Sequence, residues 1–254
     1  MIIAIMNNKG GTGKTTTCVN LSAALAMAGY SVLLIDLDGQ ASASLSLGIA
    51  HHLLRPSIAD VIFDKMPVET AVRHSDIERL DLLTGSMELA NTDLILGDMP
   101  SRETALLKSL DPIRKKYDFI MLDCAPSISL LTINAFSASD SIIIPLSAEY
   151  LALEGMISLL HTFERLKTEF NLKTRIMGVV FTMVNRNLKT SRKVIQIVKS
   201  QFGRHVFKTE IKRAVRLCEA PSHGNSIYEY APSSTSAEQF SSLAREVLDR
   251  SGMK

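Results

Sequence analysis

Short apolar runs alternate with longer amphipathic segments along this chain. The short runs are rich in Ile, Val and Leu, which predicts buried strands, and the longer segments carry apolar side chains three or four positions apart, which predicts helices. The predicted strands are residues 1–6, 31–36, 79–83, 116–123, 140–145 and 178–186. The predicted helices are residues 17–28, 88–96, 103–116, 149–170, 188–202 and 235–250, with another starting near Pro56. Such alternation predicts one twisted, mostly parallel sheet with helices on both faces, a doubly wound α/β fold in a single domain over residues 1–254.

Two local features modify these predictions. Pro145 is expected to end the strand that it follows, and residues 41–47, which are small and mostly polar, are expected to form a mobile loop. Only 6% of the residues are aromatic and none is Trp. The core must therefore be aliphatic, which suits a buried parallel sheet.

A glycine-rich segment, residues 8–16, joins the first predicted strand to the first predicted helix. It reads Asn-Lys-Gly-Gly-Thr-Gly-Lys-Thr-Thr. Glycine has no Cβ, so the backbone can turn tightly and bring its N–H groups and the helix N-terminus close to an anion. Lys14 is expected to bridge the β- and γ-phosphate oxygens of a nucleotide, and the Thr15 hydroxyl to hold Mg²⁺. The expected nucleotide contacts are Gly10, Gly11, Thr12, Gly13, Lys14, Thr15 and Thr16.

Three carboxylates follow two of the predicted strands. Asp36 and Asp38 lie on the same side of an extended backbone, and Asp123 ends an apolar run in the manner of a Walker B segment. Open α/β sheets bind their ligands at the carboxyl ends of the strands. Asp123 is therefore expected to bind Mg²⁺ through water, since this ion keeps several of its waters in proteins.

The glycine-rich segment departs from the common pattern G-x-x-x-x-G-K-[ST]. Asn8 stands where the first glycine is usual, and Lys9 adds a second lysine. The string K-G-G-T-G-K-T-T resembles the deviant Walker A motif of the ParA/MinD family of ATPases. In that family the extra lysine reaches across a dimer interface to the partner subunit's nucleotide, so the resemblance implies this role for Lys9. The alternative is a solvated loop lysine.

The resemblance also covers the segment after the second predicted strand, where the family pattern is D-x-D-P-Q. It implies that Asp38 orients the attacking water and that Asp36 supports the Mg²⁺ shell. The implied catalytic residues are Lys9, Lys14 and Asp38, and the implied metal residues are Thr15, Asp36 and Asp123. Gly39 replaces the usual proline and loosens this loop. The alternative for Asp38 is a helix cap or a turn residue.

Residues 205–224 resemble the ParA branch in particular, through the pattern V-F-x-T-x-I-P-R-x-V-R-L-x-E-A-P-S-H-G. Lys212 replaces the proline of that pattern. In related ATPases the residue at the position of Asn185 contacts the adenine, and the resemblance places Pro221 at a wall of the adenine site. The alternative for Asn185 is a turn-forming asparagine.

The segment from Arg186 to Arg216 is strongly basic. It holds ten Lys and Arg residues and one acid, Glu210, a local charge of +9 that leaves −7 for the rest of a chain with net charge +2. Such a segment predicts a polyanion partner, and the family resemblance indicates nonspecific double-stranded DNA. The expected DNA contacts are Arg186, Lys189, Arg192, Lys193, Lys212, Arg213 and Arg216. The alternative is a solvated basic face.

Three classes of protein fit the sequence less well. The cysteines are Cys18, Cys124 and Cys218, without a C-x-x-C pair, which argues against disulfides, zinc and an iron–sulfur carrier and favours a reducing cytoplasm. The chain starts in a strand, so neither a signal peptide nor a preceding operator-reading domain is expected. No apolar run approaches the roughly 20 residues of a membrane span, and the amphipathic helix at 235–250 balances its charges, which favours docking on the body over membrane targeting.

The expected function is that of a ParA/Soj-like ATPase. The resemblance implies binding of ATP and Mg²⁺, a homodimer with two nucleotides between its subunits, DNA binding by that dimer and release on hydrolysis. It further implies slow turnover, stimulation by a ParB-like protein, and a cytoplasmic, nucleoid-associated role in chromosome or plasmid segregation. The alternatives are a MinD-like ATPase at a membrane, a relative that positions a protein or organelle cargo, and a scaffold that uses ATP only to hold the dimer.

Overall fold

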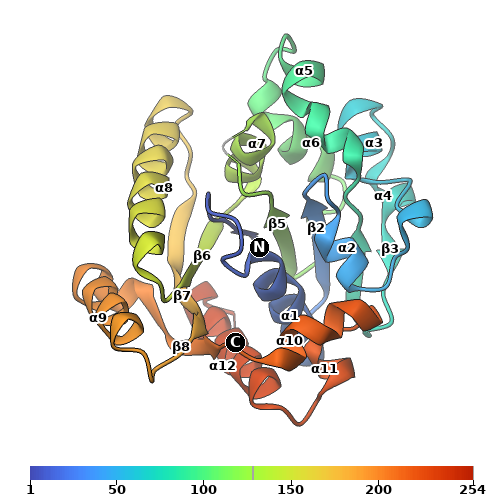
Figure 1. Ribbon diagram of the computed structural model, residues 1–254. Coiled ribbons are helices and arrows are strands. Elements are labelled where there is room, and N and C mark those ends of the chain that lie inside the picture. The colour runs from blue at the N-terminus through green and yellow to red at the C-terminus, as the bar shows by residue number, and fades with distance from the viewer. Residues whose placement is uncertain (128, 254) are drawn as a thin grey trace.

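The computed structural model describes residues 1–127 and 129–253, with the backbone alone at 150–155. Its centre is an eight-stranded sheet with the strand order β3-β4-β2-β5-β1-β6-β7-β8 (Figure 1). All neighbouring strands are parallel except β3 and β4. The strands are β1 (Ile2–Ile5), β2 (Val32–Leu37), β3 (Arg73–His74), β4 (Leu80–Leu83), β5 (Phe119–Cys124), β6 (Ser141–Ser147), β7 (Arg175–Val184) and β8 (Val206–Lys212). The predicted fold class is confirmed.

The α-helices connect these strands and cover both faces of the sheet. They are α1 (Lys14–Met27), α2 (Ser42–Ser46), α3 (Ile58–Phe63), α4 (Val68–Ala71), α5 (Thr92–Leu96), α6 (Ala105–Leu110), α7 (Leu130–Ala138), α8 (Tyr150–Glu169), α9 (Lys189–Phe202), α10 (Val215–Glu219), α11 (Ile227–Tyr230) and α12 (Thr235–Ser251). Short 3₁₀ segments lie at His51–Leu53, Met87–Asn91, Arg102–Thr104, Gly203–His205 and Ala220–His223. No helix within residues 1–127 and 129–253 combines the length and the hydropathy of a membrane span.

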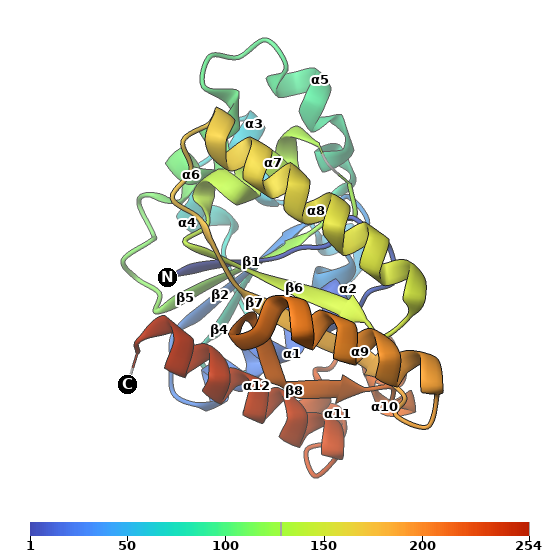
Figure 2. The same ribbon diagram turned by 90° about the vertical axis from the view of Figure 1, so that its left-hand side faces the viewer.

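Alternate side chains of each central strand enter two separate apolar clusters. In β1, Ile2 and Ala4 pack on one face, while Ile3 and Ile5 pack on the other. Helices α3, α6, α7, α8 and α9 contribute to the first cluster, and α1, α11 and α12 contribute to the second. Figure 2 shows α7 and α8 on one side of the strands and α1 and α12 on the other. Burial on both faces explains why the strands read as unbroken aliphatic runs.

Several predicted element boundaries are wrong. Residues 42–46 form α2 where a loop was expected, and the predicted helices at 88–96 and 103–116 are shorter segments interrupted by 3₁₀ turns. Pro145 lies inside β6 and does not end it. Its carbonyl accepts a hydrogen bond from the Asn7 side chain at 2.7 Å, on the side where β1 has already ended. The missing N–H of Pro145 therefore faces no neighbouring strand, so the sheet loses no hydrogen bond there.

The terminal helix α12 packs on the body, as its balanced charges predicted. It contacts α1 and β8 along its length. The Glu246 carboxylate accepts hydrogen bonds from the backbone N–H groups of Lys208 and Thr209 at 2.8 and 2.7 Å. The Arg250 guanidinium donates to the carbonyls of Met177 and Val206 at 2.8 and 3.0 Å. Charged groups of this helix thus satisfy backbone groups of β7 and β8.

Candidate nucleotide site

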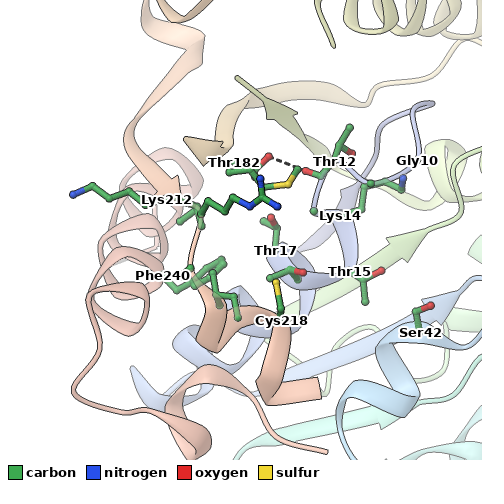
Figure 3. A pocket seen from close by; sticks show the side chains of 18 of the residues that line it. Gly10, Thr12, Lys14, Thr15, Thr17, Ser42, Thr182, Lys212, Cys218 and Phe240 are labelled. Atoms are coloured by element: carbon green, nitrogen blue, oxygen red, sulfur yellow. Dashed lines mark hydrogen bonds between the residues drawn. The ribbon is translucent and has the colours of Figure 1, made fainter. Parts of the chain in front are cut away.

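The glycine-rich segment forms a tight turn between β1 and α1. Gly11 and Gly13 have φ angles of 70° and 80°, in the left-handed region that glycine adopts without strain. A Cβ on Gly13 would lie 3.6 Å from Thr182, an ordinary contact, so its φ angle and not a lack of space requires glycine. The Thr182 hydroxyl donates to the Thr12 carbonyl at 2.8 Å and ties the turn to β7 (Figure 3).

The two lysines of this turn lie in different surroundings. The Lys14 side chain is buried, lines a cavity beside the turn, and donates from Nζ to the Lys9 carbonyl at 3.1 Å. Burial lowers the pKa of Lys14, and the negative charge of Asp123 partly offsets this effect. Lys9 does not line that cavity, and its side chain makes no hydrogen bond or ion pair within the described part of the chain. Lys14 thus lines the cavity beside the turn, whereas Lys9 does not.

The strand register brings the predicted metal carboxylates together. Asp123 on β5 lies opposite Asp36 on β2 and opposite Ile5 on β1, the strand that leads into the turn. Asp123 is 1% exposed, and neither of its carboxylate oxygens has a hydrogen-bond partner among the described residues. Burial and the nearby Asp36 charge raise the pKa of Asp123. A buried carboxylate that accepts no hydrogen bond is stabilised by a nearby cation. These residues therefore fit a hydrated Mg²⁺ beside the Thr15 hydroxyl.

Asp36 has a different environment, because hydrogen bonds occupy both of its oxygens. Oδ1 accepts from the backbone N–H of Asp38 at 3.1 Å. Oδ2 accepts from the backbone N–H and the hydroxyl of Ser44 at 2.8 and 2.7 Å. The Ser44 hydroxyl in turn accepts from the Gly85 N–H at 3.1 Å. Asp36 therefore holds the segment that carries Asp38 through hydrogen bonds. With both oxygens occupied, Asp36 can support a metal site only indirectly.

Asp38 itself lines the cavity beside the turn. One carboxylate oxygen, Oδ1, accepts from the Gln40 N–H at 2.9 Å, and this carboxylate is only partly buried. It lies in the same cavity as Lys14 and Thr15. This position suits a group that accepts a hydrogen bond from a water molecule near the phosphates.

The position of the Asp38 segment also requires glycine at position 85. A Cβ on Gly85 would lie 2.6 Å from the Asp38 carbonyl oxygen and 3.0 Å from the Asp36 carboxyl carbon, closer than side chains approach. At Gly39, where the resembling family has proline, the nearest atom to an added Cβ lies at 3.6 Å, an ordinary contact. The backbone packs closely at Gly85 and leaves room at Gly39.

We therefore expect Gly85→Ala to destabilise the protein by about 1–3 kcal/mol, the usual cost of an inserted methyl group in a packed site. It should also lower ATP turnover, because the Asp38 carbonyl must move. Urea unfolding followed by circular dichroism, together with a phosphate-release assay, measures both effects. Gly39→Ala is the matched control and should change stability by less than about 1 kcal/mol. Equal effects of the two substitutions would contradict the packing argument.

Two adjoining cavities make up the candidate site. The first, of about 460 Å³, is lined by Gly10, Gly11, Thr12, Gly13, Lys14, Thr15, Thr16, Thr17, Asp38, Ser42, Pro126, Thr182, Met183, Ile211, Lys212, Arg213, Ala214, Leu217, Cys218 and Phe240. The second, of about 690 Å³, is lined by Val184, Asn185, Arg186, Asn187, Lys212, Arg213, Ala214, Val215 and Cys218. The two cavities share a wall formed by residues 212–214 and Cys218, so the candidate site extends from the glycine-rich turn to Asn185.

Only one of the two predicted adenine contacts lies at these cavities. Asn185 lines the second cavity, next to the turn cavity, which suits a base contact. Pro221 is exposed and lines neither of the two cavities described above. The structure thus brings Asn185, but not Pro221, to the site.

The predicted DNA-contacting residues fall into two groups. Lys189, Arg192 and Lys193 are exposed on α9, and Arg216 is exposed on α10, clear of both cavities. Lys212 and Arg213 line both cavities, although the Lys212 amine points away from the turn in Figure 3. Arg186 lines the second cavity and also pairs with Glu210. Because β7 and β8 are parallel neighbours, the starts of α9 and α10 lie at the same edge of the sheet.

Ten residues that line the first cavity were not among the predicted site residues. Three of them, Thr182, Ser42 and Phe240, come from elements far from the glycine-rich turn in sequence. A hydroxyl near the carboxyl end of the otherwise apolar run 178–184 was a usable signal for Thr182. Ser42 fell in a segment interpreted as a loop, and Phe240 in a terminal helix interpreted as structural. No local pattern marks the last two, because α2 and α12 reach the site only through folding.

Comparisons with known proteins show which family this chain resembles. Residues 1–176 match the family model described as AAA domain. The sporulation initiation inhibitor protein Soj of Bacillus subtilis is 44% identical over 246 residues, covering 97% of this chain and 97% of that protein. The chromosome partitioning protein ParA of Caulobacter vibrioides is 38% identical over 251 residues, covering 98% of this chain and 94% of that protein.

A solved structure extends the comparison to a bound nucleotide. Cobyrinic acid a,c-diamide synthase from Mycobacterium smegmatis, with bound ADP and magnesium, superposes with a TM-score of 0.87. It is 28% identical in sequence, and the match covers 99% of this chain and 95% of the synthase chain. The synthase, which shares this fold, was thus solved with ADP and magnesium bound.

Proposed function

This chain belongs to the ParA/MinD superfamily of P-loop ATPases, and we propose from this premise that it segregates chromosomes or plasmids as an ATP-dependent, DNA-binding dimer. It is an ATPase of the ParA type, and its cofactors are ATP and Mg²⁺. The identity to Soj and ParA, 44% and 38%, exceeds the 28% identity to the synthase, which favours partitioning over amide synthesis.

The residues at the turn suit the phosphates of ATP. The backbone N–H groups of residues 10–15 and the start of α1 supply donors for the β- and γ-phosphate oxygens. Lys14 would exchange its bond to the Lys9 carbonyl for bonds to these oxygens. Thr15 and Asp123 would hold Mg²⁺, which supplies positive charge against the phosphates when bound. Asn185 offers both a donor and an acceptor to the adenine edge.

Catalysis then consists of orientation and charge. Asp38 accepts a hydrogen bond from the attacking water and aligns it with the γ-phosphate. Lys14 neutralises charge that develops on the leaving oxygens, and Lys9 of the second subunit adds a further ammonium group from across the interface. The network from Asp36 through Ser44 to Gly85 keeps the Asp38 segment in place.

The observation that carries the dimer proposal is the separation of the two lysines. Lys14 lines the cavity of its own subunit and Lys9 does not. A patch of exposed apolar side chains near the Asp38 segment is a second argument for an interface there. Its members are Met87, Leu94, Ile95 and Met99, with exposures of 77, 84, 38 and 43%. The Met87 carbonyl lies 3.8 Å from the Cβ position of Gly39, so the patch adjoins this segment.

Light scattering after gel filtration tests the dimer. We expect a monomer without nucleotide and with ADP, and a dimer with a nonhydrolysable ATP analogue and Mg²⁺. Lys9→Ala should stay monomeric in the analogue while still binding it. A monomer under all three conditions, even in the Asp38→Ala protein, would overturn the proposed mechanism.

The basic edge at the starts of α9 and α10 would bind DNA through its phosphates. Lys189, Arg192, Lys193 and Arg216 are exposed and form no ion pair within the described residues. Contacts of this kind carry no sequence information, so the affinity should be nonspecific and should fall steeply with salt. A dimer doubles the number of such contacts, which explains why ATP would control DNA binding.

We expect the double substitution Arg192→Glu with Arg216→Glu to weaken DNA binding about 10²-fold or more at 100 mM salt, since four charges per subunit are changed. Both residues lie outside the two cavities, so dimerisation with the ATP analogue should persist. Fluorescence anisotropy with a labelled duplex, compared across the nucleotide-free, ADP and analogue states, measures this. Unchanged affinity would move the DNA site elsewhere.

The proposal also covers the rate of turnover, the partner that stimulates it and the cellular location. Intrinsic turnover should be slow, because the backbone leaves room at Gly39 and the adjacent Asp38 must be held to position the water. A ParB-like protein would stimulate turnover. The protein would act in the cytoplasm on the nucleoid. Release of ADP and phosphate would return the monomer and free the DNA.

A further inference from the structure

The basic segment 186–216 contains one acid, Glu210, and its carboxylate is engaged by two of the cations of that segment. Arg186 donates from Nε and Nη2 to the two carboxylate oxygens at 2.9 and 2.7 Å. Lys199 donates from Nζ to Oε1 at 3.0 Å. The Glu210 side chain is only 9% exposed, whereas those of Arg186 and Lys199 are 64 and 42% exposed. An inner carboxylate thus lies beneath two outer cations.

This pairing is strong by the standards of a protein surface. The Arg186–Glu210 contact is bidentate, which fixes the plane of the guanidinium, and Lys199 adds a second charged donor. Burial alone would raise the pKa of Glu210, but the hydrogen bonds from Lys199 and Arg186 outweigh burial and lower it. The carboxylate is therefore ionised at neutral pH, and it competes with any external anion for both cations.

The location of the pair links it to the proposed DNA surface. Arg186 follows β7, Lys199 lies on α9, and Glu210 lies on β8 opposite Phe181 of β7. Among the described residues, the other cations of this segment have no carboxylate within ion-pair distance, so Arg186 and Lys199 differ from them. The Glu210 carboxylate therefore opposes the expected contribution of Arg186 to DNA binding.

We infer that Glu210 is an internal counter-ion that competes with DNA phosphates for Arg186 and Lys199 and so limits the DNA affinity of this protein. The inference rests on the proposed function, since it concerns the same basic surface. A weaker hold on DNA would let a nucleotide-bound dimer leave more readily. The partner is a phosphodiester backbone, and the regulating group is a carboxylate that occupies the same donors.

Removing this carboxylate should therefore strengthen DNA binding. We expect Glu210→Gln to bind a duplex about three- to tenfold more tightly at 100 mM salt in the ATP-analogue state, with a log–log salt slope steeper by about 1 to 2. The amide keeps the size and one acceptor oxygen, so the fold should persist. Asp76→Asn, in the turn between β3 and β4 at the opposite edge of the sheet, removes the same charge from an exposed residue and is the control for net charge.

A double-substitution cycle separates competition from a purely structural role. Arg186→Gln should weaken DNA binding less in the wild-type background than in the Glu210→Gln background, because only the latter leaves Arg186 available. Unchanged or weaker DNA binding by Glu210→Gln, or an equal gain in Asp76→Asn, would overturn the inference.

A second polyanion keeps this test independent of the proposed function. Retention on heparin without nucleotide should rise for Glu210→Gln and not for Asp76→Asn. If the wild-type protein binds no DNA in any nucleotide state, the proposed function fails, and a heparin shift still decides whether Glu210 masks the two cations. If the wild type binds DNA and neither assay responds to Glu210→Gln, only the counter-ion inference fails.

Discussion

Replacing Lys14 by alanine is expected to abolish ATP binding at micromolar nucleotide. The Lys14 ammonium is buried at the wall of the cavity, near the Asp123 carboxylate, which accepts no hydrogen bond from the described residues. It would make two charge-assisted hydrogen bonds to phosphate oxygens, each contributing about 1.5–3 kcal/mol, so the dissociation constant should rise about 10²–10⁴-fold. Isothermal calorimetry or a fluorescent nucleotide measures the change directly.

The control for this prediction is the neighbouring lysine. Lys9→Ala removes the same side chain from the same turn, but Lys9 does not line the cavity of its own subunit. It should bind nucleotide within a few-fold of the wild type and fail to dimerise. If Lys14→Ala kept tight ATP binding, the assignment of the turn as the phosphate site would be wrong. If Lys9→Ala lost nucleotide binding as well, the two lysines would share one role within a subunit.

The second large effect is expected at Asp38. Asp38→Ala should leave ATP binding intact and lower hydrolysis about 10²–10⁴-fold, the usual contribution of a positioned acid–base or water-orienting group. Because the γ-phosphate is retained, the protein should accumulate as an ATP-bound dimer on DNA. Single-turnover phosphate release measures the first effect, and light scattering with ATP measures the second.

Asp38→Asn refines this test. The amide keeps the size of the side chain and can still accept from the Gln40 N–H, so the segment should keep its conformation. If hydrolysis requires the carboxylate charge, the asparagine protein should resemble the alanine protein. Normal turnover in either variant would show that Asp38 does not orient the water. Ser42, which lines the same cavity, would then be the next residue to test for this role.

The glycine-rich turn could be located from local sequence because its backbone geometry depends on adjacent residues. Glycines at positions 11 and 13 supply left-handed backbone, and Lys14 begins the helix that the turn initiates. Each of these properties follows from one residue and its immediate neighbours. The same holds for Asp123, the second-to-last residue of the apolar strand β5.

The errors occurred where an element depends on distant partners. Residues 42–46 form a helix because Ser44 bonds to Asp36 and Gly85, and neither bond is visible in a short polar segment. Pro145 continues its strand because β1 has ended beside it. The adenine contact of Pro221 stays a prediction from the resemblance, since Pro221 lies on an exposed 3₁₀ turn outside the two cavities described above.

The order of aliphatic and polar residues along the chain was sufficient for the α/β architecture, the glycine-rich turn and the carboxylates near the strand ends, since backbone preference and burial act over a few neighbouring residues. Folding alone decided which charges meet. Strand register set Asp36 opposite Asp123, and the packing of β8 against α9 set Glu210 beneath Arg186 and Lys199. These contacts join residues between 11 and 87 positions apart, from Lys199–Glu210 to Asp36–Asp123. Electrostatic attraction and repulsion depend on distance in space, which local sequence does not contain.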